Sequence, residues 1–340
     1  MSLFSKSFVC LFAVAVASII PVSANAQIFG GGNAGPLIEF QNTVDFDLTP
    51  VIGCEFYDPT EDAGTLREFV CLVLLPFLVD DLLEAEAFCD AVFVGYRDDI
   101  PSVLRNQLVD PVFINVIVDE IDGPGGVLAQ AGPIAGIDTD GDGEIDLPGI
   151  LSIIPPPYLQ TRRFRAWSVP RFAQMTIDLE DIPLMVFSDT MVCTAVHEAF
   201  HALGHPSTFE ISNLNQPSTP FGSPNFVGDR FGPNGHGYGI TEYRIESENP
   251  LAEFVPLSPG DGSAHLSGAD PTFFDFNENL QEVFLAVQGF GTNYMSRTLR
   301  GMYADMGYKI RGVNAFGIID IDGDGSDDLP LIVNPIPDDG

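Results

Sequence analysis

The sequence is short of basic residues. It has 14 Lys and Arg against 48 Asp and Glu in 340 residues, which gives a formal net charge of −34. Phosphate contacts need Lys and Arg, so this balance disfavours nucleic acids and anionic membrane surfaces as partners. Divalent cations suit such a surface. The hydrophobic fraction of 45% is enough for a buried core.

Long hydrophobic runs are also scarce. At the N-terminus, Lys6 precedes an apolar run from Phe8 to Ile20, and Ala24-Asn25-Ala26 follows. This order is typical of a secretory signal peptide, so residues 1–26 are predicted to be removed and the mature chain to be secreted outside the cell or into a periplasm. The run from Phe69 to Val79 is too short to cross a bilayer and predicts a buried helix. No transmembrane segment is expected in the mature chain.

Cysteine is rare, and its spacing excludes one kind of site. Four cysteines remain after signal cleavage, and no two of them show the C-x-x-C spacing of a thiolate metal site. An even number in an exported protein predicts two disulfides, with three possible pairings. The four residues are Cys54, Cys71, Cys89 and Cys193.

The mature chain is expected to have three parts. Residues 27–85 form an N-terminal lead-in, Gly-rich at first and helical from about residue 66 to residue 96, and are a candidate pro-segment. Residues 86–312 form the main domain, and residues 313–340 form a C-terminal tail. Gly, Pro, Asn and Ser are frequent at 206–262, which predicts a long loop region.

Short strands are expected inside the main domain. Phe113–Val118 is a β-branched run, Val127–Ala131 follows a Gly-Pro-Gly-Gly turn, and Arg171–Leu179 has alternating apolar residues. Together with the helices, these strands predict an α+β fold class.

The segment after the third strand carries the H-E-x-x-H motif, at His197, Glu198 and His201. Its apolar residues recur at helical spacing, and Ser188 or Asp189 is expected to cap the start of the helix. Positions four apart share one face of a helix, so the two imidazoles can bind one zinc ion. Glu198 projects beside them and can take a proton from a metal-activated water.

A third protein ligand is required, because catalytic zinc usually has three. Ten residues after His197, where a compact motif places its third histidine, the sequence has Ser207. His205 lies about 12 Å of helical rise from His197 and is expected not to share the ion. Spacing alone does not choose among the other candidates, which are His236, His265, Asp229, Glu210 and Glu242.

Four blocks of the sequence resemble those of a known family. The helix motif His197–Gly204 is followed by a long insertion that ends at Ser263-Ala264-His265, and Ser296–Tyr308 ends in Asp-x-Gly-Tyr. Ile121–Pro133 and Met175–Asp181 are similar to strands that precede the catalytic helix. Over roughly residues 85–312, these blocks resemble the leishmanolysin-like zinc metallopeptidases of the metzincin group.

The resemblance implies a fold and an activity. The fold is a metzincin-like catalytic domain with a twisted mixed sheet, an active-site helix and a C-terminal helix. Zinc would be bound by His197, His201 and His265, and Glu198 would be the general base of a secreted zinc endopeptidase that hydrolyses protein and peptide substrates. The strand at 127–131 would hydrogen-bond an extended substrate.

The sequence departs from the family at two positions. Leu266 follows His265 where the family usually has Trp. The family also has a Met in a turn beneath the zinc, where either Phe284 or Met295 stands in this chain. Such a Met packs under the ligands and does not bind the ion, so its loss need not abolish activity.

An Asp-rich pattern occurs twice, as an insertion at 137–149 and in the C-terminal tail. Alternating carboxylates on a Gly-broken loop converge on one hard cation, so each loop predicts a structural Ca²⁺ site. Neither loop has the Glu of an EF-hand at its twelfth position, and Pro flanks both, which indicates a different type of calcium loop. The predicted ligands are Asp138, Asp140, Asp142 and Asp146, and Asp320, Asp322, Asp324 and Asp328. These loops support an alternative function, a calcium-binding surface or adhesion protein that has a metallopeptidase scaffold and little or no turnover.

Overall fold

The structure is a computed structural model. Backbone contacts divide the chain into residues 1–38 and residues 39–340. The residues described are all in the second unit: 44–97, 100, 112–137, 144–154, 166–188, 190–209, 212, 214–216, 225–228, 237–258, 265–267, 270–275, 280–282, 292–310 and 331–333. The predicted signal peptide, 1–26, lies outside these residues.

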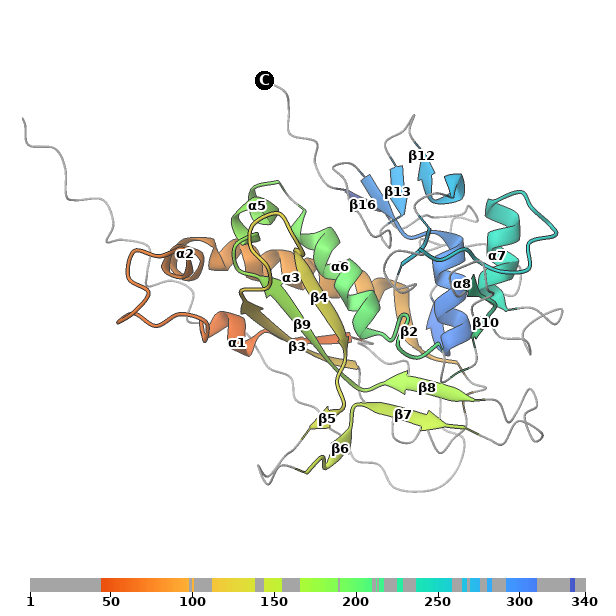
Figure 1. Ribbon diagram of the computed structural model, residues 1–340, viewed down its shortest axis with the longest axis horizontal. Helices are drawn as coiled ribbons and strands as arrows, with labels where there is room; N and C mark the ends of the chain where they lie inside the picture. Colours follow the sequence, from red (N-terminus) through yellow and green to blue (C-terminus); the bar gives the residue numbers. More distant parts are fainter. Residues whose placement is uncertain are drawn as a thin grey trace, which may run out of the picture. The chain divides into compact units, whose positions relative to one another are not determined.

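The described chain contains both helices and strands (Figure 1). The helices are α1 (Thr49–Ile52), α2 (Leu66–Phe69), a π-helical turn (Val70–Leu74), α3 (Leu75–Val92), α5 (Ile182–Phe187), α6 (Met191–Ala202), α7 (Tyr238–Glu246), a 3-10 turn (Pro271–Phe273) and α8 (Arg297–Met306). The strands are β1 (Val44–Asp47), β2 (Phe93–Tyr96), β3 (Val112–Asp119), β4 (Ala129–Pro133), β5 (Gly136–Ile137), β6 (Leu147–Pro148), β7 (Ile150–Ile153), β8 (Trp167–Pro170), β9 (Phe172–Asp178), β10 (Asn215–Gln216), β11 (Asn225–Phe226), β12 (Phe274–Asp275), β13 (Leu280–Glu282), β14 (Thr292–Tyr294), β15 (Tyr308–Ile310) and β16 (Leu331–Val333).

A four-stranded mixed sheet carries the main core. Its order is β1-β3-β9-β4, in which β1, β3 and β9 are parallel and β4 runs antiparallel to β9. The three predicted strands correspond to β3, β4 and β9, with β4 displaced by two residues. In β3, buried residues alternate with half-buried ones, as expected when one face of a sheet is covered. The predicted α+β class is confirmed at this coarse level.

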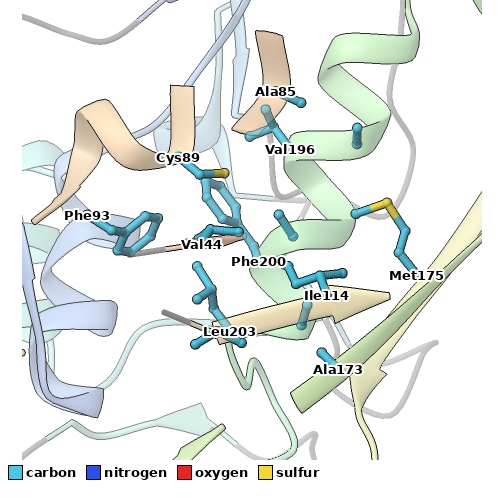
Figure 2. Packing of buried hydrophobic residues seen from close by; sticks show 14 of the residues in the cluster. Val44, Ala85, Cys89, Phe93, Ile114, Ala173, Met175, Val196, Phe200 and Leu203 are labelled. Atoms are coloured by element: carbon cyan, nitrogen blue, oxygen red, sulfur yellow. The ribbon is translucent and has the colours of Figure 1, made fainter. Parts of the chain in front are cut away.

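Two helices pack on this sheet and on each other. α3 contacts β1, α6 contacts β9 and β4, and α3 contacts α6. Figure 2 shows the interior between them, where Ala85 and Cys89 of α3 lie with Val196 and Phe200 of α6 above Ile114 of β3. Because one face of α6 is held by this packing, the neighbouring face with the histidines has a defined direction.

Residues of the expected lead-in take part in this core. β1 is an edge strand of the central sheet, and the suggested boundary at residue 85 falls inside α3. The helix predicted at 66–96 forms as far as Val92, and Phe93–Tyr96 is instead the strand β2, paired with β15. An extended Phe93 places its ring 5.2 Å from that of Tyr303 and 5.5 Å from that of Tyr308. Within the described residues, no helix is both long and apolar enough to cross a bilayer.

The cysteines form one disulfide among the described residues. Cys54 and Cys71 are joined, with their Cα atoms 5.8 Å apart. The prediction of a second disulfide is wrong, because Cys89 and Cys193 remain thiols. Both are fully buried, in α3 and α6, where a thiol packs as a small apolar side chain.

The helix α7 was not predicted from the sequence, and it forms a reciprocal pair with α8. Asp305, near the end of α8, accepts hydrogen bonds from the backbone N–H groups of Tyr238 (2.8 Å) and Gly239 (3.0 Å) at the start of α7. In return Glu246, the last residue of α7, accepts hydrogen bonds from the first two backbone N–H groups of α8. A carboxylate at each helix start satisfies N–H groups that have no partner within the helix.

Removing one of these carboxylates should lower stability. We expect Asp305→Ala to reduce the free energy of unfolding by about 2–3 kcal/mol, because one buried and one half-buried N–H group lose the acceptor that the buried Asp305 provides. Asp305→Asn keeps one acceptor oxygen and should lower the free energy of unfolding by less. Urea denaturation followed by circular dichroism measures both, with the exposed Glu253→Ala as control. Equal stability of the three variants would contradict the role assigned to Asp305.

Candidate metal centre

The helix α6 presents the H-E-x-x-H residues. It begins at Met191 with Thr190 as the preceding cap position, so the predicted cap at Ser188 is wrong, and the alternative, Asp189, lies outside the described residues. The reason is that Ser188 ends α5, where its backbone N–H and its hydroxyl both donate to the carbonyl of Leu184. The predicted end of the helix is confirmed, since Gly204 has a positive φ of 107° just after α6.

Three imidazoles meet at one point. Nε2 of His265 lies 3.0 Å from Nε2 of His197 and 3.1 Å from Nε2 of His201. Two nitrogens that share a tetrahedral zinc at about 2.0–2.1 Å are about 3.3 Å apart, so the three residues fit a metal ion. Nitrogens this close share either a proton or an ion. These residues are a group that can bind a metal, and the sequence-based choice of His265 agrees with it.

The tautomer of His201 is set by its neighbour. Its Nδ1–H donates to the backbone carbonyl of His205 at 2.8 Å, which leaves the lone pair on Nε2, the atom that faces His265. The ring of His205 is 1% exposed and packs edge-on against Phe209 at 4.3 Å. His205 therefore supports His201 through its backbone and is not part of the imidazole group, as predicted.

A short antiparallel contact holds His265. Leu257 and Leu266 form a β-bridge, both are buried, and the backbone N–H of Ser258 donates to the carbonyl of His265 at 2.9 Å. This contact brings the end of the long insertion to α6. Among the other ligand candidates, Glu242 forms an ion pair with Arg297 at 2.9 Å. The remaining candidates, His236, Asp229 and Glu210, lie outside the described residues.

Glu198 connects the centre to the edge of the sheet. Its side chain is 94% buried, and its carboxylate accepts a hydrogen bond from the backbone N–H of Ala131 in β4. Burial raises the pKa of this carboxyl to about 8, against the opposing effect of that hydrogen bond. Oε2 is buried with no hydrogen-bond partner among the described residues. A carboxylate on the helix that carries two of the imidazoles is suited to accept a proton.

Two tyrosines hold the end of α6. The hydroxyl of Tyr303 donates to the carbonyl of Phe200 at 2.7 Å, and that of Tyr308 donates to the carbonyl of Leu203 at 2.9 Å. Both carbonyls belong to the last turn of the helix, where no intrahelical donor remains. Sequence reasoning did not assign this role to the tyrosines. The available signal was their position in the block that ends in Asp-x-Gly-Tyr.

The other predicted site residues are only partly within the described chain. Met295 is fully buried just before α8, and Phe284 lies outside the described residues, so the identity of the turn residue stays a prediction. Of the Asp-rich loops, Asp146 is exposed, and its backbone N–H donates to the carbonyl of Ile137 next to the β5–β6 pair. The rest of the predicted calcium ligands lie outside, namely Asp138, Asp140, Asp142, Asp320, Asp322, Asp324 and Asp328.

Comparisons with known proteins assign no family. No family model matches the chain, and no curated protein matches it.

Proposed function

We propose that this protein is a secreted zinc endopeptidase of the leishmanolysin-like metzincin type. The observation that supports the proposal best is the convergence of three imidazole nitrogens, two of them from the helix that also carries the buried Glu198. Imidazole donors favour zinc over hard cations such as calcium and magnesium. Three features of the fold are compatible with a metzincin-like domain. They are the mixed sheet with its antiparallel edge strand, the H-E-x-x-H helix and the C-terminal helix.

The roles of the chain's own groups follow from their positions. His197, His201 and His265 would hold the ion, and the carbonyl of His205 would keep His201 in the ligating tautomer. Zinc at such a centre polarises a carbonyl and lowers the pKa of water. Glu198 would take the proton of the attacking water and deliver it to the leaving amine.

The strand β4 is the proposed substrate platform. It is the last strand in the sheet order, and Ala131 already contributes its N–H to Glu198. An extended peptide added along this edge would place its main chain beside the catalytic carboxylate. The affinity would then come mainly from backbone hydrogen bonds, so a broad range of unfolded polypeptides is the expected substrate class.

Selective metal removal tests this proposal. We expect casein hydrolysis to stop in phenanthroline, which removes zinc, and to return when zinc is added. Elemental analysis should find about one zinc per chain, as expected for a single three-histidine centre.

The alternative predicts the opposite pattern. A calcium-binding surface or adhesion protein would contain no zinc and would not hydrolyse casein. The two Asp-rich segments are the observation that favours it. We propose that they bind structural Ca²⁺ in either case, so calcium binding alone does not separate the two functions.

A further inference from the structure

A second group of buried acids lies at the carboxyl end of β9. Asp178 is the last residue of this strand and is 0% exposed, and Asp181, one turn later, is 1% exposed. β3 ends beside β9, with Asp119 opposite Asp178, and the loop to β4 follows. Neither segment 112–137 nor segment 172–188 contains a Lys or Arg. The acids therefore have no basic residue on the elements that carry them.

One oxygen of each carboxylate ties the turn to the loop. Oδ1 of Asp178 accepts the N–H groups of Glu180 (3.1 Å) and Ile121 (3.5 Å). Oδ1 of Asp181 accepts the N–H of Gly125 at 2.7 Å. Both carboxylates thus contact the loop at 119–127.

The second oxygen of each carboxylate has no hydrogen-bond partner in the part of the chain that the structure describes. Oδ2 of Asp178 and Oδ2 of Asp181 are both buried and unpartnered among the described residues. Burying such an oxygen without a partner is costly, and far more so when it is charged. Burial raises the pKa of Asp181 most, the hydrogen bond from Gly125 opposes this, and the carboxylates of Asp178 and Asp122 raise it further. The ion pair described for this loop joins Arg67 to Glu120 at 2.9 Å and includes neither Asp178 nor Asp181.

We infer that Asp178 and Asp181 bind a calcium ion between the turn after β9 and the loop before β4. Carboxylate oxygens are ligands of hard cations, and calcium accepts an irregular set of six to eight oxygens that water can complete. The site contains no imidazole or thiolate, which disfavours zinc. It is distinct from the His197 centre and from both Asp-rich loops.

The bound calcium ion would restrain the loop that precedes the edge strand β4. The loop at 119–127 leads directly into β4, and Ala131 of β4 donates to Glu198. A cation that bridges loop and turn would reduce the motion of this strand relative to β9. The competing explanation is that the two carboxylates share a proton and bind no ion.

Calcium binding by the full chain can be tested after the Asp-rich loops are disabled. A background variant with Asn at Asp140, Asp142, Asp322 and Asp324 removes charges from both loops. In this background, we expect calcium chloride to raise Tm by several degrees, because an ion that binds only the folded state stabilises it. Either Asp178→Asn or Asp181→Asn should weaken calcium binding by about tenfold or more in isothermal titration calorimetry, since each removes a charged ligand.

A matched control makes the same Asp-to-Asn change but leaves Asp178 and Asp181 in place. Asp119→Asn alters an exposed acid at the same end of the sheet and should leave calcium affinity within about threefold. Loss of affinity in all three variants would overturn the proposal, because it would indicate a general effect of surface charge. A background variant whose Tm does not change with calcium would also overturn the proposal. That is the outcome expected if the two acids share a proton.

Hydrogen exchange provides a readout that does not depend on folding of the variants. In the unsubstituted chain, calcium should slow amide exchange at 119–127 and 178–181. Protection confined to the Asp-rich loops would overturn the proposal. Because casein hydrolysis is not measured, failure of the proposed peptidase function would leave this result unaffected.

Discussion

Replacing Glu198 by Gln is expected to lower kcat/KM for casein or peptide hydrolysis by about 10²–10⁴-fold, the usual contribution of a general base. Gln has the same shape and can still face Ala131, but it cannot take a proton from water. The imidazole group is unchanged, so zinc content should stay at that of the unsubstituted protein. Initial rates and elemental analysis of the same preparation measure both effects.

The control for this variant is Glu253→Gln, which makes the same change at an exposed position on another part of the chain. It should leave the rate unaltered. Full activity of Glu198→Gln would contradict the assigned mechanism. Loss of zinc together with activity would assign Glu198 to metal binding, because a base that acts only on water has no reason to affect occupancy.

Local patterns were sufficient to predict the parts of the fold that depend on them. The i, i+4 spacing of His197 and His201 places them on one helix face whatever surrounds the helix, and α6 forms there. Alternating β-branched residues predicted β3 because half of such a strand is buried against a core. Gly307, with φ of 114°, ends α8 in the same way as Gly204 ends α6.

Features that depend on distant residues were not predictable in this way. The helix α7 has little apolar periodicity of its own, and its first N–H groups are satisfied by Asp305 of α8. β1 looked like an extended lead-in because its place in the sheet comes from pairing with β3. The thiol of Cys89 was expected in a disulfide, but burial in α3 is a tertiary property that cysteine number does not reveal.

The third metal ligand is the clearest example of a feature that local sequence patterns do not identify. His265 is 64 residues from His201, and spacing left it equal to His236 and several carboxylates. The family resemblance, not the local pattern, favoured it. In the structure its position depends on the bridge between Leu257 and Leu266, a pairing that no short motif encodes.

Replacing His265 by Ala is therefore the most direct test of the centre. Loss of a group that merely supports a ligand typically costs 10–100-fold in metal affinity, so removal of a ligand should cost at least about 10²-fold. Hydrolysis should fall with zinc occupancy, and zinc should no longer raise Tm, since that stabilisation depends on binding to the folded state. Competition with a fluorescent zinc chelator measures the affinity.

Two further variants separate a ligand from a packing residue. His265→Asp offers a carboxylate oxygen, which zinc accepts, so it should recover part of the affinity that Ala loses. His236→Ala removes the other candidate histidine of the insertion and should retain both zinc and activity. The reverse result, with zinc lost in His236→Ala and kept in His265→Ala, would contradict the assignment. The imidazole of His265 would then lie beside His197 and His201 because of proton sharing, which the same 3.0–3.1 Å separations also allow.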